Sequence, residues 1–215
     1  MSFLPLALIV VSYLLGSIPF SFIIVWILER DDIRLHGSGN VGATNVMRNF
    51  GRLPGAIALV LDIAKGWVAV EVARMVTVQT EWPWRYSGAA SDWMHAPSFW
   101  IGLAALVAVL GHMYPVWLGY RGGKGVATAT GVFLAMQPAV IAVAAVVFVI
   151  TLIATRYVSL SSIVAAVAVP VLLRFFTGST FWIVLFSILI SVIIVIRHRA
   201  NIARIVNGEE RKFPR

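Results

Sequence analysis

The 215-residue sequence contains no cysteine and little charge, with Asp, Glu, Lys and Arg together making up 12% of it. Without cysteine there is no disulfide, no thiol nucleophile and no Cys-ligated metal. The low charge excludes an ordinary soluble domain, in which about 25% of residues are charged. Apolar residues are abundant instead, at 60% of the chain, and the mean hydropathy is +0.91. We therefore expect an integral membrane protein.

Long apolar blocks account for most of the chain, and the sequence predicts a helix in each. They cover approximately 3–28, 53–78, 98–118, 126–154, 157–176 and 180–196. A span needs about 20 apolar residues, and helices are the open-chain structures that satisfy their own backbone in lipid. Because Gln137-Pro138 interrupts the fourth block, we predict separate crossings at about 126–136 and 138–154. The expected fold is all-α, with about seven transmembrane helices in a single membrane domain, 1–215.

The polar segments between the blocks differ strongly in basic residues. Most of the 17 Lys and Arg residues fall in 29–52, 119–125 and 197–215, whereas 79–97 holds only Arg85. Cytoplasmic loops are enriched in Lys and Arg. We therefore predict that the three basic segments and the carboxyl terminus are cytoplasmic. The amino terminus and 79–97, with Trp82, Trp84 and Trp93, are expected outside.

The first basic segment reads LHGSGNVGATNVMRNFG from Leu35 to Gly51. Glycines allow backbone N–H groups to converge into anion-binding nests, and hydroxyls and an arginine add donors and charge. A flexible loop is the alternative, but such a loop rarely combines so many donors with an arginine. The residues of this candidate site are Gly37, Ser38, Gly39, Asn40, Thr44, Asn45 and Arg48.

The second segment reads GHMYPVWLGYRGGKGVAT from Gly111 to Thr128. A nucleotide-binding P-loop is excluded, because that motif requires glycine six residues before the lysine and Ser or Thr after it. Those positions hold Leu118 and Gly125. What remains is Lys124 among Gly122, Gly123 and Gly125 before an apolar helix, which favours a phosphate site. The alternative is simple anchoring of the loop at the cytoplasmic face.

The third segment reads RHRANIARIVNGEE from Arg197 to Glu210. A basic tail after a last span usually anchors at the lipid surface, but His198, Asn201 and Ile205 would share one helical stripe. Inside the second block, Asp62/Lys65 and Glu71/Arg74 are each spaced i, i+3. Charges at membrane depth are functional candidates, but for both pairs we favour mutual pairing. No spacing of His, Asp or Glu indicates a metal site.

Taken together, the three segments resemble the three cytoplasmic motifs of the PlsY family, the membrane acyl-phosphate:glycerol-3-phosphate acyltransferases. GSIPF (16–20), LDIAKG (61–66) and TRYVSLSS (155–162) also resemble that family, over essentially the whole chain. The resemblance implies seven spans, with the motif segments 35–51, 111–128 and 197–210 on the cytoplasmic face of the cell (inner) membrane. It implies transfer of a fatty acyl group from acyl phosphate to the 1-hydroxyl of sn-glycerol 3-phosphate, giving lysophosphatidic acid and phosphate.

The same resemblance implies roles for individual residues. The catalytic residues it implies are Ser38, Arg48, Lys124, His198 and Asn201. The substrate-binding residues it implies are Gly37, Gly39, Asn40, Thr44, Asn45, Gly122, Gly123, Gly125 and Glu209. The general base is either the phosphate of the substrate or His198. No cofactor, metal or nucleic acid is expected, and the implied partners are membrane lipid and the soluble enzyme that makes acyl phosphate.

Two other classes compete with this interpretation. A membrane transporter or flippase for a phosphorylated solute would place its polar groups near the midplane, within repeated halves, and no repeat is visible here. A scaffold on anionic lipid needs charge but no donor-rich loop around Ser38. Acyl-CoA enzymes of glycerolipid synthesis carry an HxxxxD pair, and none of the four histidines is followed by aspartate at that spacing.

Overall fold

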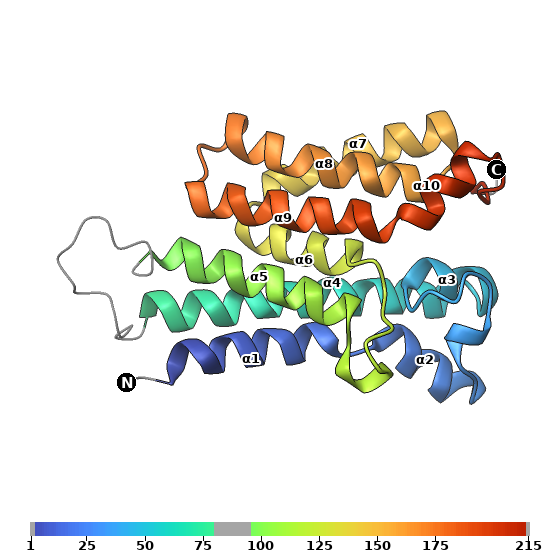
Figure 1. Cartoon of the computed structure of the whole chain (residues 1–215), viewed down its shortest axis with the longest axis horizontal. Helices are drawn as coiled ribbons and strands as arrows, with labels where there is room; N and C mark the ends of the chain where they lie inside the picture. Colours follow the sequence, from blue (N-terminus) through green and yellow to red (C-terminus); the bar gives the residue numbers. More distant parts are fainter. Residues whose placement is uncertain (1–2, 80–95, 214–215) are drawn as a thin grey trace. The chain divides into compact units, whose positions relative to one another are not determined.

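The computed structural model describes residues 3–79 and 96–213, and within these ranges every regular element is a helix. The all-α prediction is thus confirmed for the described residues (Figure 1). The predicted outward segment 79–97, with Trp82, Trp84 and Trp93, lies outside them except at its ends. The chain forms two compact units, Met1–Ala135 and Met136–Arg215. The single membrane domain stays a prediction.

The first unit is a bundle in which α1, α4 and α5 pack against one another and α3 packs on α4 (Figure 1). Its elements are α1 (Leu4–Ser17), α2 (Phe20–Glu29), η1 (Ile33–Leu35), α3 (Ala43–Asn49), α4 (Arg52–Arg74), η2 (Met75–Gln79), α5 (Pro97–Met113), η4 (Val116–Leu118) and α6 (Val126–Met136), whose last residue falls in the second unit. The buried positions of α5 are mostly small, among them Ala104, Ala105 and Ala108. Small side chains allow the helix axes to approach closely, which favours tight packing in a membrane.

Proline residues set two helix boundaries. The block 126–154 divides as predicted, because α6 ends at Met136 and α7 begins at Pro138. The block 3–28 also divides, which its unbroken apolar composition does not predict. Ile18 has ψ 116° before Pro19, and α1 and α2 lie on either side of them. The residue before a proline is pushed out of the helical region, so the helix stops there.

The second unit contains four helices: α7 (Pro138–Thr155), α8 (Val158–Phe176), α9 (Phe181–Arg197) and α10 (Arg199–Val206). Within this unit, α8 packs against both α7 and α9 (Figure 1). The Ser191 hydroxyl on α9 donates to the Ala166 carbonyl on α8 at 2.6 Å. The chain turns by 53° between α9 and α10, which places His198 at a bend.

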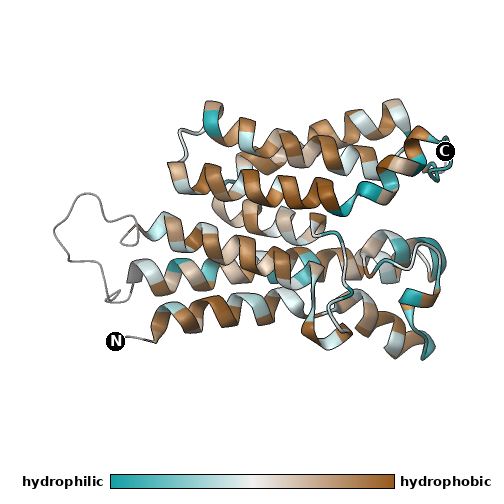
Figure 2. Ribbon diagram, in the orientation of Figure 1, coloured by the Kyte–Doolittle hydropathy of each residue, from teal (hydrophilic) through white to brown (hydrophobic). Residues whose placement is uncertain are grey.

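The helices have the lengths and composition of membrane spans. Four stretches of the described chain are long and apolar enough to cross a bilayer, namely Leu4–Glu29, Pro97–Leu118, Pro138–Thr155 and Val158–Phe176, and the bent α9–α10 pair makes a fifth. Figure 2 shows apolar colour along these helices and polar colour around α3 and the α9–α10 bend. The chain is a multi-pass membrane protein. Seven crossings require α4, which carries two ion pairs, and the short α6, so that number stays a prediction.

Candidate active site

Asn45 organises the first predicted site loop from inside. It is buried on α3, and its Nδ2 donates to the carbonyls of Ile33 (3.3 Å) and His36 (3.0 Å). Its Oδ1 accepts the backbone N–H of Ser38 at 3.2 Å. Gly37 is in the left-handed region with φ +58°, which glycine adopts without strain. Asn45 therefore holds the loop, and its predicted contact with substrate stays a prediction.

The exposed side of this loop carries the predicted anion-binding groups. Ser38 is exposed, and Thr44 and Arg48 are exposed one turn apart on α3, so they share a face. Gly39 has φ +67° and its N–H donates to the His36 carbonyl at 2.9 Å. That N–H is therefore used inside the loop. Asn40, which is half-buried, lies between Gly39 and α3.

Two acidic residues stabilise the start of the loop. Arg34 bridges to Asp32 at 2.6 Å, and His36 lies 2.7 Å from Asp31. The hydrogen bonds from Arg34 hold the pKa of the Asp32 carboxyl below its ordinary value. These groups pair with each other and fix the segment that enters the loop.

The second predicted loop folds back onto the end of α5. The N–H groups of Gly122 and Gly123 donate to the carbonyls of Met113 (3.2 Å) and His112 (3.1 Å). The protein therefore uses these two N–H groups internally, to hold the loop against α5. Their predicted contact with substrate stays a prediction. Lys124 is half-buried in this loop.

Gly125 ends the second loop and precedes α6. It has φ +83°, and its carbonyl accepts the N–H of Ala129 at 2.8 Å, so the first helical turn of α6 starts there. Lys124 is thus held directly before a helix N-terminus, as the glycine-rich pattern predicts.

His198 occupies the bend between α9 and α10, where it is buried. Its Nδ1 lies 2.8 Å from the Ile194 carbonyl oxygen. A carbonyl oxygen only accepts, so Nδ1 carries the proton and, in the neutral ring, Nε2 carries the lone pair. This arrangement gives the ring nitrogen Nε2 the ability to accept a proton.

Glu210 connects the third predicted segment to α8. Its carboxylate accepts from Ser159 Oγ (2.6 Å), Asn201 Nδ2 (2.6 Å) and Arg204 Nε (2.8 Å). Burial raises the pKa of Glu210, but these three hydrogen bonds outweigh it and bring the pKa below its ordinary value. Glu209, the predicted binding residue, is exposed and its N–H donates to the Arg204 carbonyl at 2.7 Å. The carboxylate that orients Asn201 is therefore Glu210, which the sequence pattern does not single out.

The last residues of the chain reinforce this connection. Arg156, in the left-handed region at the end of α7, donates from Nη2 to the Phe213 carbonyl at 2.9 Å. The Phe213 N–H donates in return to the Arg156 carbonyl at 2.7 Å, and Lys212 Nζ lies 5.7 Å from the centre of the Tyr157 ring. The tail thus holds Glu210 against the α7–α8 turn.

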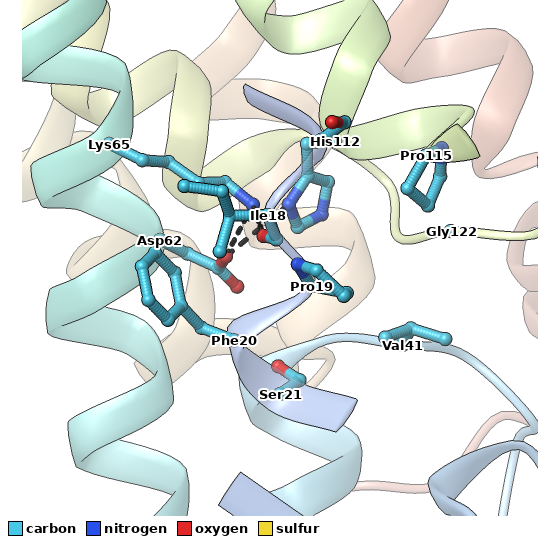
Figure 3. Close-up of a pocket in the computed structure, with 11 residues that line it drawn as sticks. Ile18, Pro19, Phe20, Ser21, Val41, Asp62, Lys65, His112, Pro115 and Gly122 are labelled. Carbon is cyan, nitrogen blue, oxygen red and sulfur yellow. Dashed lines mark hydrogen bonds and ion pairs between the residues drawn. The ribbon is translucent and has the colours of Figure 1, made fainter. Parts of the chain in front are cut away.

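A buried polar cluster of Asp62, Lys65 and His112 lies within the first unit (Figure 3). Lys65 Nζ is 2.7 Å from Asp62 Oδ1, and both side chains are 2% exposed. His112 Nδ1 is 3.5 Å from the same oxygen. Arg74 likewise pairs with Glu71 at 2.7 Å, so the predicted mutual pairing of both sets is confirmed. Neither His112 nor its proximity to Asp62 is predicted, because the two are 50 residues apart.

The predicted site residues divide between the two units. Those numbered 37 to 125 belong to the first unit, and His198, Asn201 and Glu209 belong to the second. Within the described ranges 3–79 and 96–213, no group of three or more His, Cys, Asp or Glu side chains is placed to hold a metal ion.

Comparison with known proteins identifies the family. The model of the family described as "Glycerol-3-phosphate acyltransferase" matches residues 6–208. A glycerol-3-phosphate acyltransferase of Geotalea daltonii is 40% identical over 98% of each chain, and glycerol-3-phosphate acyltransferase 2 of Bacillus cereus is 43% identical over 95% of this chain and 93% of that one. The crystal structure of PlsY (YgiH), an integral membrane glycerol 3-phosphate acyltransferase, in its glycerol 3-phosphate form has a TM-score of 0.84 and 37% identity, covering 98% of this chain and 96% of that one. On this evidence the chain belongs to the glycerol-3-phosphate acyltransferase family.

Proposed function

We propose that this acyltransferase takes its acyl group from acyl phosphate and transfers it to the 1-hydroxyl of sn-glycerol 3-phosphate. The products are lysophosphatidic acid and inorganic phosphate, in the first acylation step of phospholipid synthesis. The observation that carries the proposal is the family match over residues 6–208. The related PlsY has a glycerol 3-phosphate form and a lysophosphatidic acid form, which are an acceptor and an acylated product.

The chemistry explains why the site needs cations and donors more than a nucleophile. Acyl phosphate is already an activated mixed anhydride, so positioning and charge stabilisation supply most of the catalysis. Both substrates carry phosphate. In the proposal, Ser38, Arg48 and Lys124 bind these anions, and the glycines and polar residues around them shape the binding surface. No cysteine is present to form a thioester intermediate.

The transfer step follows from this arrangement. The 1-hydroxyl oxygen attacks the acyl carbonyl carbon, a C–O ester bond forms, and the C–O bond to phosphate breaks with its electron pair leaving on phosphate. The hydroxyl proton goes to a base, either the phosphate of glycerol 3-phosphate or Nε2 of His198. The Nδ1–H of His198 is donated to Ile194, which supports Nε2 as the accepting atom. Asn201, oriented by Glu210, would hold a substrate oxygen.

The proposal also fixes the place of the reaction. The basic segments containing the predicted site residues face the cytoplasm, and the chain lies in the cell (inner) membrane with seven spans and its amino terminus outside. The acyl chain stays in the lipid while the phosphates meet at the cytoplasmic surface. Acyl phosphate comes from a soluble enzyme, and the acylated product remains in the membrane.

Phosphate release by the purified protein tests this function. Acyl phosphate and glycerol 3-phosphate together should give inorganic phosphate and lysophosphatidic acid in equal amounts, and omission of glycerol 3-phosphate should abolish both. Lys124→Ala should lose activity, while Arg121→Ala, which removes an exposed charge from the same loop, serves as the matched control. Phosphate release that is independent of glycerol 3-phosphate would identify a phosphatase and contradict the proposal.

A further inference from the structure

Three segments of the first unit meet at the buried cluster of Asp62, Lys65 and His112. The cluster borders a cavity of about 10 Å³, enough for one water molecule. The cavity is lined by residues of the α1–α2 break, by Val41 of the first site loop and by Gly122 of the second (Figure 3). Two of these three segments carry the predicted anion-binding residues.

His112 connects the cluster directly to the second loop. Its Nδ1 points to Asp62, and its carbonyl accepts the Gly123 N–H at 3.1 Å. The imidazole lies so close to the loop that a Cβ at Gly123 would overlap Nε2, and the same Cβ would be 2.8 Å from the Val41 carbonyl oxygen. The position of the ring and the position of the loop are therefore tied to each other. Gly123 immediately precedes Lys124.

Lys65 connects the cluster to the helix break. Its Nζ donates to the carbonyl of Ile18 at 2.7 Å, while it pairs with Asp62 at the same distance (Figure 3). The Ile18 carbonyl lies at the α1–α2 break, where it also accepts the Phe20 N–H at 3.1 Å. The ammonium is thus a second donor to this carbonyl and links α4 to the break.

Stability alone does not account for charged groups at this site. Replacing a buried ion pair by apolar side chains of similar volume is often neutral or stabilising, because desolvation offsets the attraction. Such a pair does, however, impose directions that apolar packing does not. Here the orientations of both side chains of the ion pair are fixed. Lys65 is held by its hydrogen bond to the Ile18 carbonyl, and Asp62 is held by the nearby His112 ring.

We propose that Asp62, Lys65 and His112 are positioning residues that hold the loop carrying Lys124 in the geometry required for acyl transfer. This inference rests on the proposed function, because it assumes that Lys124 binds a substrate phosphate. Asp62 lies about 15 Å along α4 from Arg52, the residue at which that helix begins, at 1.5 Å per residue. The three residues act through the loop and not on the substrate itself.

The test compares Asp62→Asn, Lys65→Met and the double variant of the full-length protein in detergent micelles. Glu71→Gln is the matched control, because Glu71 forms the same i, i+3 pair on α4 but does not line the cavity. Four quantities are measured for each protein: Tm without ligand, stabilisation against heat by glycerol 3-phosphate, and kcat and KM for glycerol 3-phosphate with acyl phosphate as the donor.

Each single variant should lower Tm, because it leaves one buried charge unpaired, and the double variant should recover most of that loss. All three should lose about tenfold or more in kcat/KM, with a raised KM for glycerol 3-phosphate, because a small misplacement of the loop is costly. The double variant should not recover this loss. Recovery of kcat/KM together with Tm, or an equal loss in Glu71→Gln, would show a merely structural cluster and overturn the proposal.

A second pair of variants tests His112 in case the charge variants do not fold. His112→Asn places a side-chain amide near the position of Nδ1, whereas His112→Ala leaves no polar group there. The asparagine variant should retain more kcat/KM than the alanine variant, and equal losses in the two would contradict the role of the Asp62 contact.

If the wild type does not use acyl phosphate, the proposed donor is wrong. Heat stabilisation by glycerol 3-phosphate still reports the loop geometry, so the two failures are distinguishable.

Discussion

Replacement of Glu210 by glutamine removes one negative charge from a site of three donors while keeping its shape. Ser159 and Asn201 both donate to Oε1, and Arg204 donates to Oε2. A glutamine amide has one acceptor oxygen and one NH₂ group. Whichever way it is oriented, the NH₂ group points at another donor, either the Nε of Arg204 or the Nδ2 of Asn201. At least one hydrogen bond is therefore lost, and the others change from a charged acceptor to a neutral one.

The magnitude follows from these contacts. A hydrogen bond to a neutral acceptor is weaker than one to a charged acceptor by about 1 kcal/mol, which applies to Ser159 and Asn201. The Arg204 side chain is 38% exposed, so solvent screens its pair with Glu210 and the loss adds up to about 1 kcal/mol. Glu210→Gln should therefore destabilise the protein by about 2–3 kcal/mol. For a chain of this size that is a fall in Tm of roughly 5–10 °C.

The effect should depend on pH in a defined direction. The pKa of Glu210 in the folded protein is below its ordinary value of 4.5. A group with a depressed pKa contributes stability that is fully present above the unfolded pKa and is lost as pH falls through the folded pKa. The difference in Tm between wild type and Glu210→Gln should therefore be constant above about pH 5.5 and shrink below pH 4.5.

Thermal unfolding in detergent at a fixed scan rate, from pH 7 downward, measures this difference. Glu209→Gln is the matched control, because Glu209 is the adjacent carboxylate and is exposed. Its effect on Tm should be small at every pH. Equal destabilisation by both variants, or a Glu210→Gln deficit that is unchanged at low pH, would refute the reasoning.

The remaining predictions concern substrate binding and topology. Lys124→Ala and Arg48→Ala should each lower kcat/KM roughly hundredfold, as loss of a charge-stabilising donor does, while Arg121→Ala stays close to wild type in the phosphate-release assay. Arg48→Lys should also have a low kcat/KM, because the point charge of lysine does not replace a bidentate guanidinium. Wild-type kinetics in this variant would show that Arg48 makes no bidentate contact with substrate. Cysteine introduced at Asn207 should resist a membrane-impermeant thiol reagent added outside intact cells, and one at Arg85 should react. The reverse pattern would overturn the topology.

Proline and hydropathy together predict most of the helices but not all of their breaks. Gln137-Pro138 is recognisable because a polar residue accompanies the proline, and the structure breaks there. The Ile18-Pro19 break obeys the same steric rule, yet it lies within an unbroken apolar run in which hydropathy merges α1 and α2. Local composition therefore locates spans better than it locates the interruptions within them.

The candidate site shows a similar division. Residue types in the three polar segments predict donors and cations there, and the structure places Ser38, Thr44 and Arg48 on exposed positions of the first segment. Their contact with substrate stays a prediction. Residue types do not distinguish Glu209 from Glu210, because the turn after α10 decides which carboxylate faces Asn201. Long-range contacts are also invisible to local patterns. The sequence alone suggests that the Gly123 N–H can bind an anion, but in the structure it donates to the His112 carbonyl.

The most direct test of the central claim is a comparison of two acyl donors with one protein preparation and glycerol 3-phosphate as acceptor. Acyl phosphate should support formation of lysophosphatidic acid, and acyl-CoA of the same chain length should not. The physical reason is that the leaving group of acyl phosphate is the anion that Arg48 and Lys124 are proposed to bind. The CoA thiolate of an acyl-CoA is a poorer leaving group than phosphate, and the chain has no HxxxxD pair to assist it. Equal or faster turnover with acyl-CoA would contradict the proposed donor chemistry, whereas turnover with acyl phosphate alone is the result that the account predicts.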